Sequence, residues 1–274
     1  MSWKKEVEDG DRFEFGENWS IFLNGLNDER IEESKSQLIK WLGNIENKTF
    51  LYIGNGSGIH SLAAKMLGAK VYSFEYDLQG VECAKILKER YFPDDNNWNI
   101  EKGRALDKEY IQSLGKFDIV YSWRVLHHTG EMYKAFEYTE MAVNKRGYLF
   151  ISIYNNQGYA SEIWSKYKNI YLSNGFIIKN ILLYSLLIYS ELRGSVKRLL
   201  TKKNPFSFKH WDKYYKHRGM SRMHDYLDWV GGYPFEVAKP EEIFDFYKKK
   251  GYTIEKQKTC AGGKGCNEFL FKNI

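Results

Sequence analysis

The stretch Leu51-Tyr-Ile-Gly-Asn-Gly-Ser-Gly58 decides how this chain folds. An apolar run that ends in Gly-x-Gly-x-Gly is typical of a strand that turns sharply into a helix around a ligand, because glycine tolerates positive φ and lets backbone approach closely. Glu75 ends the next apolar run, about 20 residues further on, where an acidic side chain suits a ribose with two free hydroxyls. Ile59 stands where the dinucleotide-binding pattern has a glycine. The loop and the acid together predict a nucleoside-cofactor site; a purely structural strand–helix turn is the alternative.

Strands and helices alternate from residue 49 to residue 154. The predicted strands are Thr49–Ile53, Lys70–Glu75, Trp98–Lys102, Phe117–Ser122 and Tyr148–Tyr154. The predicted helices between them are His60–Leu67, Leu78–Tyr91, Lys108–Leu114 and Glu131–Val143, and a turn at Asn144–Gly147 leads into the fifth strand. Alternating elements of this length predict a parallel sheet with helices on both faces.

The end of the chain adds one helix and two strands. Pro240–Lys250 is the predicted helix, because proline is favoured in a first helical turn. Tyr252–Lys258 and Asn267–Lys272 are β-prone runs joined by a glycine-rich loop, which predicts an antiparallel hairpin and an antiparallel strand at the sheet edge. The predicted fold class is therefore α/β: a seven-stranded Rossmann-like sheet, mostly parallel with an antiparallel C-terminal hairpin, plus a helical insertion.

The predicted domain organisation has three parts. Residues 1–48 form an N-terminal helical arm, residues 49–154 and 236–274 form the cofactor-binding core, and residues 155–235 form a helical insertion, because such a length is too great for an unstructured connection. Within the insertion, Phe176–Leu192 is almost continuously apolar and Arg193–Lys203 is basic. We expect a buried helix pair here; a helix lying in a membrane interface is the alternative.

Composition excludes some classes of protein. No run of 18 apolar residues is present, so no segment is expected to span a membrane. The three cysteines form no disulfide-rich pattern and the region from Lys4 to Arg12 is charged, which together favour a cytoplasmic location. The net charge of +6 is too modest and too dispersed to indicate nucleic-acid binding. The sequence leaves the oligomeric state open.

Four motifs resemble those of the class I S-adenosylmethionine (SAM) methyltransferases, over Thr49–Tyr154 and again from Pro240 onward. They are Tyr52–Gly58, Val71–Glu75, Lys116–Ser122 with Val125–His128, and Arg146–Ile151. The chain is most similar to a bacterial small-molecule subgroup with Phe-Gly-x-Asn-Trp near the N-terminus and Val-Leu-His-His-Thr-Gly after the fourth strand. Here these motifs are Phe15–Trp19 and Val125–Gly130, and the family's Cys-Asn-Glu-Phe ending is Cys266–Phe269. The resemblance implies SAM as the cofactor.

The resemblance also implies which residues hold SAM. The glycine loop would line its methionine part, Glu75 its ribose, Tyr76 its adenine ring and the segment from Gly103 its adenine edge. The full set of cofactor residues implied in this way is Gly54, Asn55, Gly56, Gly58, Glu75, Tyr76, Ala105, Leu106, Asp107 and Trp123. Arg104 stands where many relatives have an acid, and Tyr52 stands where aspartate is frequent, so two polar contacts of the family are not expected here.

The residues predicted to carry the chemistry are His127 and His128, which follow the fourth strand at the edge where such sheets bind ligands. A hydroxyl acceptor must lose a proton, and a histidine is a suitable base. By analogy with relatives, we expect His128 to face the pocket and His127 to pack; a structural hydrogen bond is the alternative for either. No metal is expected, because the spacing of Cys260 and Cys266 does not suit zinc.

Six residues are predicted to contact the methyl acceptor. They lie on the N-terminal arm, after the fifth strand and in the insertion: Trp19, Tyr154, Asn156, Arg218, Arg222 and His224. The two arginines flank Gly-Met-Ser and could clamp a phosphate or carboxylate, although a solvated basic loop has the same composition. The insertion is expected to act as a lid over the acceptor.

The function favoured by the sequence is methyl transfer to a hydroxyl of a small molecule, such as a sugar or a nucleotide-linked cell-surface precursor. Methylation of a small-molecule nitrogen and methylation of nucleic acid are alternatives. Base methylases carry Asn/Asp-Pro-Pro-Tyr/Phe after strand four, whereas this chain has Ser122-Trp-Arg-Val, so no nucleic-acid partner is expected. A non-catalytic protein that binds a partner or a membrane through Phe176–Lys203 is a further alternative.

Overall fold

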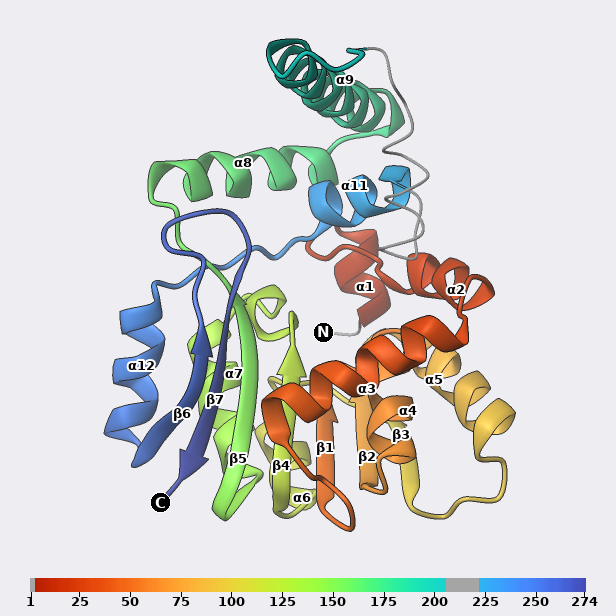
Figure 1. Ribbon diagram of the computed structural model, residues 1–274, viewed down its shortest axis with the longest axis vertical. Coiled ribbons are helices and arrows are strands. Elements are labelled where there is room, and N and C mark those ends of the chain that lie inside the picture. Colours follow the sequence, from red (N-terminus) through yellow and green to blue (C-terminus); the bar gives the residue numbers. More distant parts are fainter. Residues whose placement is uncertain (1–2, 206–221) are drawn as a thin grey trace. The chain divides into compact units, whose positions relative to one another are not determined.

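The computed structural model describes residues 3–205 and 222–274, apart from the side chains of Glu17, Arg222 and His224. The main structural element is a seven-stranded sheet with the order β3-β2-β1-β4-β5-β7-β6 (Figure 1). The strands are β1 Thr49–Ile53, β2 Lys70–Glu75, β3 Trp98–Lys102, β4 Phe117–Trp123, β5 Val143–Tyr154, β6 Tyr252–Lys258 and β7 Cys266–Asn273. The predicted fold class is confirmed: the sheet is mostly parallel and carries an antiparallel C-terminal pair.

The antiparallel strand is not at the edge of the sheet, where the sequence predicted it. β7 pairs antiparallel with both β5 and β6, so β6 is the edge strand and β7 is interior. The sequence explains this order, because β7 contains the buried residues Phe269, Leu270 and Phe271, whereas most of β6 is exposed. The more apolar of the two strands occupies the interior position.

Helices cover both faces of the sheet (Figure 1). Those packed with the sheet are α3 Asp28–Leu42, α4 Ile59–Met66, α5 Leu78–Tyr91, α6 Lys108–Ser113, α7 Met132–Met141 and α12 Pro240–Lys249, while α2 Gly16–Asn24 packs on α5. Side chains alternate between the two faces of the sheet along β1. Leu51 and Ile53 point to the face covered by α6, α7 and α12 and belong to the apolar cluster there. Phe50 and Tyr52 contact Tyr121 on the face covered by α3 and α4.

The predicted turn Asn144–Gly147 is instead part of β5. The register of β5 against β4 runs from the pair Phe117–Val143 to the pair Ile119–Tyr148, so β5 carries extra residues opposite Asp118. Asp118 accepts a hydrogen bond from the side-chain amide of Asn144 at 3.3 Å, which holds this bulge against β4. Turn-forming residues therefore produce a bulge here, because the neighbouring strand keeps the chain extended on both sides.

The chain divides into two compact units. The sheet unit comprises residues 14–163 and 234–274, and a helical unit comprises residues 1–13 and 164–233. The sequence predicts residues 1–48 as one N-terminal arm. In the structure the first thirteen residues belong to the unit that contains most of the insertion. The proposed role of the insertion as a lid stays a prediction.

The helical unit contains α1 Trp3–Glu8, most of α8 Tyr159–Ser173, α9 Phe176–Leu200 and α11 Arg222–Gly231. A small apolar cluster centred on Tyr171, Leu183 and Val230 joins α8, α9 and α11. Phe13 packs directly on Gly231, where a Cβ atom would lie 2.1 Å from its ring, so the N-terminal residues are held against α11. This unit is therefore stabilised by contacts between segments far apart in the sequence.

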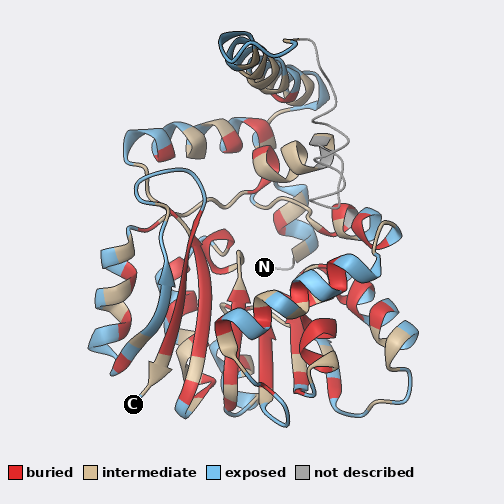
Figure 2. Ribbon diagram, in the orientation of Figure 1, coloured by how far each residue is buried: buried red, intermediate tan, exposed pale blue. Residues whose placement is uncertain are grey.

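The burial expected for Phe176–Leu192 is wrong. In α9 only Leu183 is buried, and Figure 2 shows most of the helix as exposed or intermediate. The physical reason is geometric: the cluster of the helical unit covers one side of this 25-residue helix, and its other side has no cover among the described residues. No helix in the described ranges is both long and apolar enough to cross a membrane.

Candidate active site

The glycine loop follows β1 at the carboxyl edge of the parallel strands. Gly54 has φ +74°, and a Cβ atom there would lie 2.3 Å from Cγ1 of Val125. Any other residue at this position would therefore cause both backbone strain and a steric clash. Gly58 caps α4 with φ +83° in the left-handed region. The sequence signal Gly-x-Gly-x-Gly therefore corresponds to a backbone conformation that requires glycine.

Glu75 ties this loop to the end of β2. Its carboxylate accepts hydrogen bonds from the backbone N–H of Gly56 at 2.9 Å and of Tyr76 at 2.7 Å. Burial raises the pKa of the Glu75 carboxyl, and these backbone donors oppose that rise. The carboxylate thus lies beside the glycine loop, where a ribose held between β1 and β2 would find it.

The motif Phe15–Trp19 brings an aromatic side chain to the same loop. Gly16, the first residue of α2, donates its N–H to Asp77 at 2.7 Å, and a Cβ atom on Gly16 would lie 2.4 Å from Cβ of Gln79. Trp19 then lies 3.4 Å from the Cβ position of Gly56. Asp77 was missed from the sequence; its position just before the helix Leu78–Tyr91 was the available signal, because aspartate is a favoured N-cap.

The segment after β3 lies beside Glu75 and Tyr76. The N–H of Gly103 donates to the backbone oxygen of Glu75 at 3.0 Å, and the guanidinium of Arg104 lies 5.2 Å from the centre of the Tyr76 ring. Asp107 caps α6 by accepting from the N–H of Tyr110 at 3.0 Å. Ala105 is buried and Leu106 packs against the core, so the adenine contacts expected of Ala105, Leu106 and Asp107 stay predictions.

The end of β4 contains an arginine in a strained conformation. Arg124 has φ +61°, a left-handed value that is uncommon for residues other than glycine. Its guanidinium lies 4.7 Å from the ring centre of Trp123. Burial, and secondarily the charge of Arg124, lowers the pKa of His60 to about 4, so His60 is neutral near pH 7. The sequence reasoning missed Arg124, although it had placed the neighbouring Trp123 in the site.

Three side-chain N–H groups at the ends of β1 and β4 have no hydrogen-bond acceptor among the described residues. They are Nδ2 of Asn55, Nε1 of Trp123 and Nε of Arg124, and all three atoms are buried. Oδ1 of Asn55 accepts from the hydroxyl of Ser61, so only its amide nitrogen lacks a partner. β1 and β4 are neighbours in the sheet, so the unpaired donors lie together at the carboxyl ends of these two strands. An acceptor group such as a carboxylate would satisfy them.

The two histidines differ in their hydrogen bonds. His127 is completely buried, and its Nδ1 accepts from the backbone N–H of Tyr154 at 3.3 Å. Nδ1 of His128 lies 2.7 Å from the backbone oxygen of Pro234. Because a carbonyl oxygen can only accept, Nδ1 of His128 carries a proton, and the neutral ring has its lone pair on Nε2. The rings of Phe15 and Tyr154 lie within 5.4 Å of the His128 ring, centre to centre.

The residues predicted to contact the acceptor are only partly described. Tyr154 ends β5 beside the histidines, and the side-chain oxygen of Asn156 accepts from the N–H of Gly158 at 2.8 Å. Arg218 lies outside the described residues. Arg222 and His224 belong to α11, and their side chains also lie outside the description. Within the described residues, no group of three or more histidine, cysteine, aspartate or glutamate side chains could hold a metal ion.

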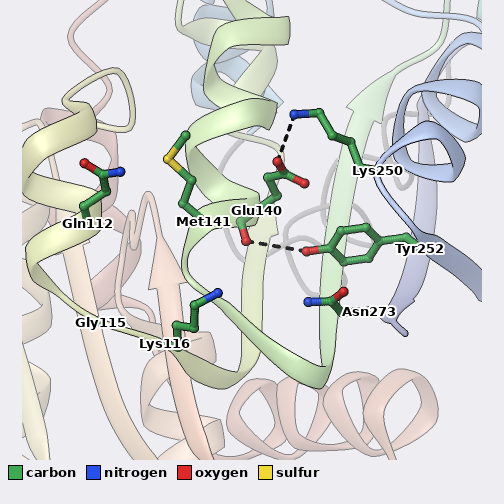
Figure 3. A pocket seen from close by; sticks show the side chains of 8 residues that line it. All are labelled: Gln112, Gly115, Lys116, Glu140, Met141, Lys250, Tyr252 and Asn273. Carbon is green, nitrogen blue, oxygen red and sulfur yellow. Dashed lines mark hydrogen bonds and ion pairs between the residues drawn. The ribbon is translucent and has the colours of Figure 1, made fainter.

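A separate hollow of about 560 Å³ lies at the opposite end of the sheet. Figure 3 shows the side chains around it: Gln112, Gly115, Lys116, Glu140, Met141, Lys250, Tyr252 and Asn273. An ion pair between Lys250 and Glu140, 3.0 Å long, crosses its rim. These residues come from the ends of α6, α7 and α12, the amino end of β6 and the carboxyl end of β7, so the hollow is distinct from the glycine loop and Glu75.

A family model for the methyltransferase domain matches residues 46–215, more than half of the chain. The chain belongs to this methyltransferase family. The match begins just before β1 and includes the glycine loop, Glu75 and the two histidines. The expectation of a methyltransferase is confirmed, while the narrower bacterial subgroup stays a prediction.

Solved structures of methyltransferases share the fold. The magnesium protoporphyrin IX methyltransferase of Synechocystis PCC 6803, with bound SAH, has a TM-score of 0.52 and 14% identity over 90% of this chain and 83% of its own. PKMT2 of Rickettsia typhi, in complex with AdoHcy, has a TM-score of 0.54 and 14% identity over 88% of this chain and 52% of its own. A SAM-dependent methyltransferase of Mesorhizobium loti has a TM-score of 0.50 and 12% identity over 87% of this chain and 96% of its own. No curated protein matches the sequence significantly.

Proposed function

We propose that this methyltransferase transfers the methyl group of SAM to a hydroxyl of a small molecule, of the sugar or nucleotide-linked class. SAM is the methyl donor. It supplies a methyl group that is bonded to a positively charged sulfur. An incoming oxygen can attack the methyl carbon in line, and the sulfur then leaves. The protein has to bind SAM, align the acceptor, exclude water and remove the hydroxyl proton.

The residues around the glycine loop fit SAM. Glu75 would accept hydrogen bonds from the ribose hydroxyls, and the aromatic ring of Tyr76 would pack on adenine. The unpaired donors of Asn55, Trp123 and Arg124 would receive the carboxylate of the amino-acid tail, because each is buried and each needs an acceptor. The cofactor would thus satisfy groups that the folded protein leaves without partners.

The observation that carries a hydroxyl acceptor is the hydrogen bond of His128. Donation from Nδ1 to Pro234 at 2.7 Å fixes the ring and leaves Nε2 as the basic nitrogen of the neutral histidine. A basic Nε2 next to the methyl donor would take the proton of a hydroxyl as its oxygen attacks. His127 uses its own Nδ1 lone pair to accept from Tyr154, so its role would be to position the neighbouring ring.

The acceptor site would be completed by Trp19, Tyr154 and Asn156, and by Arg218, Arg222 and His224 from the insertion. An acceptor with a phosphate would use the two arginines, because a guanidinium binds phosphate through two parallel hydrogen bonds. In this proposal the insertion of residues 155–235 acts as a lid.

The test is the variant His128→Asn. An asparagine amide can replace Nδ1 as donor to Pro234, but it has no group in place of Nε2. We expect turnover to fall by about 100-fold or more, with SAM affinity unchanged by calorimetry. The acidic limb of the pH–rate profile should disappear in this variant, because no base is left to protonate. His127→Asn is the matched control: its side-chain oxygen can still accept from Tyr154, and a smaller loss is expected.

Acceptors are to be found by offering labelled SAM to a panel of sugars, nucleotide sugars, small amines and RNA. Methylation of hydroxyl compounds supports the proposal. Full activity of His128→Asn, or methylation confined to amines or RNA, would contradict it. A loss of SAM binding in His128→Asn would show that the histidine supports the cofactor rather than the acceptor.

A further inference from the structure

Helix α9 in the helical unit has two different long faces. On one face, Leu182, Leu183 and Leu186 belong to the apolar cluster with residues of α8 and α11. Leu183 is 5% exposed and anchors the helix in this cluster. This face accounts for how α9 is held in its unit.

The other face carries a row of exposed apolar side chains. Ile177, Ile181, Ile188, Leu192 and Leu199 are all more than half exposed, although each is a residue that folding normally buries. Their spacings of four and seven residues place them on one side of a helix. We call these five residues the apolar stripe.

The apolar stripe differs from the exposed apolar residues on α3, α5 and α7. Exposed large apolar residues on the helices of the sheet unit, such as Ile39, Ile86 and Tyr133, are scattered over α3, α5 and α7. Single residues of that kind are ordinary on a protein surface, whereas a contiguous row along several helical turns indicates an interaction surface. Figure 2 shows the exposed residues continuing along the length of α9.

The charges near the stripe are almost all positive. Between Phe176 and Lys203 the sequence contains six basic residues and one acidic residue, Glu191. Glu191 lies 4.0 Å from Arg198, which leaves an excess of positive charge. Arg193, Lys197, Lys202 and Lys203 are exposed at the C-terminal end of the helix.

We propose that α9 docks on the surface of a membrane containing anionic lipids. The apolar stripe would enter the boundary between headgroups and acyl chains, and the basic side chains near its C-terminal end would bind lipid phosphates. The charge favours this occupant over a second copy of the chain, because a second copy offers only Glu191 against six basic residues in this segment, and Glu191 already lies beside Arg198. The helix would lie in the interface, since it is not apolar enough to span a bilayer.

The experiment is co-sedimentation of the full chain with two kinds of vesicle, phosphatidylcholine alone and phosphatidylcholine with phosphatidylglycerol. We expect the chain to pellet with the anionic vesicles, at least tenfold more strongly than with the neutral ones, and added salt should weaken binding. The double variant Ile188→Asp/Leu192→Asp should lose at least tenfold in binding. A second variant, Lys202→Glu/Lys203→Glu, should lose binding to anionic vesicles without changing any apolar side chain.

The control is Ile86→Asp, which changes a similarly exposed isoleucine of the sheet unit. It should bind vesicles like the parent chain. Circular dichroism and calorimetry with SAM establish that each variant is folded. Equal binding to both kinds of vesicle, no binding, or unchanged binding by the stripe variant would overturn the proposal. A dimer in light scattering that Ile188→Asp/Leu192→Asp converts to monomer would show that the stripe pairs with a second copy instead.

Discussion

The end of β4 and the outer face of α9 are incomplete in opposite ways. At the end of β4, polar groups are buried without acceptors: Nε1 of Trp123 and Nε of Arg124 have no hydrogen-bond partner among the described residues. Along α9, apolar groups are exposed without cover, as in Ile181 and Leu192. Both situations raise the free energy of the isolated chain, the first by desolvation of donors and the second by hydration of apolar surface. Each indicates the chemistry of what is missing: an anion for the first and an apolar, negatively charged surface for the second.

The largest expected effect tests the close packing between the glycine loop and Val125, next to the end of β4. Gly54→Ala adds a methyl group at φ +74°, 2.3 Å from Val125, and should cost about 3 kcal/mol or more in the free energy of unfolding. SAM binding should be lost with it. Gly115→Ala is the matched control, because Gly115 has φ +77° and no atom within 4 Å of the added methyl. It should cost only about 1 kcal/mol from backbone strain.

A smaller side chain at position 125 separates the steric clash from the backbone strain in Gly54→Ala. Val125→Ala should restore part of the stability of Gly54→Ala by removing the colliding methyl groups. Chemical denaturation of the two single variants and the double variant measures this coupling. If Gly54→Ala were no worse than Gly115→Ala, the close packing between the glycine loop and Val125 would not matter for folding.

An intermediate effect tests whether the unpaired donors bind the carboxylate of SAM. Arg124→Gln removes a charged donor, so SAM affinity should fall by roughly 10- to 100-fold, the size of a charge-assisted hydrogen bond. The affinity for decarboxylated SAM should stay nearly unchanged, because that ligand lacks the group in question. Calorimetry with both ligands makes the comparison. Arg90→Gln, an exposed position on α5, should leave both affinities as they are. Equal losses for both ligands would mean that Arg124 shapes the loop without contacting the carboxylate.

The sequence predicted the sheet unit more accurately than α9, for a physical reason. The bounds of β1, β2 and β3 are as predicted, because apolar runs between turn signals specify buried parallel strands locally. The bulge in β5 was missed, since its turn-forming residues are held by Asp118 on the neighbouring strand. In α9 the apolar run correctly indicated a helix, but a run of apolar residues does not specify what covers it.

The candidate site was predicted unevenly for a similar reason. Glycines and the acidic Glu75 are visible in sequence because their backbone and ribose roles restrict residue type and spacing. Asp77 and Arg124 act through contacts made in three dimensions: one accepts from Gly16, 61 residues away in the chain, and the other is defined by a left-handed backbone beside Trp123. The contact between Asp77 and Gly16 joins distant parts of the chain, and the residue type of Arg124 does not predict a left-handed backbone.

The smallest expected effect concerns the surface of α9 itself. Leu192→Ala should change the free energy of unfolding by no more than about 0.5 kcal/mol in the absence of lipid, because Leu192 is 62% exposed and its truncation leaves no cavity. Leu183→Ala is the matched variant on the same helix, and it should cost about 2–4 kcal/mol because Leu183 is buried. Urea denaturation followed by circular dichroism measures both. A cost above about 1.5 kcal/mol for Leu192→Ala would mean that the stripe is already covered by protein in solution, since only a buried leucine loses that much. The contrast between the two leucines therefore decides whether the outer face of α9 is open for a membrane.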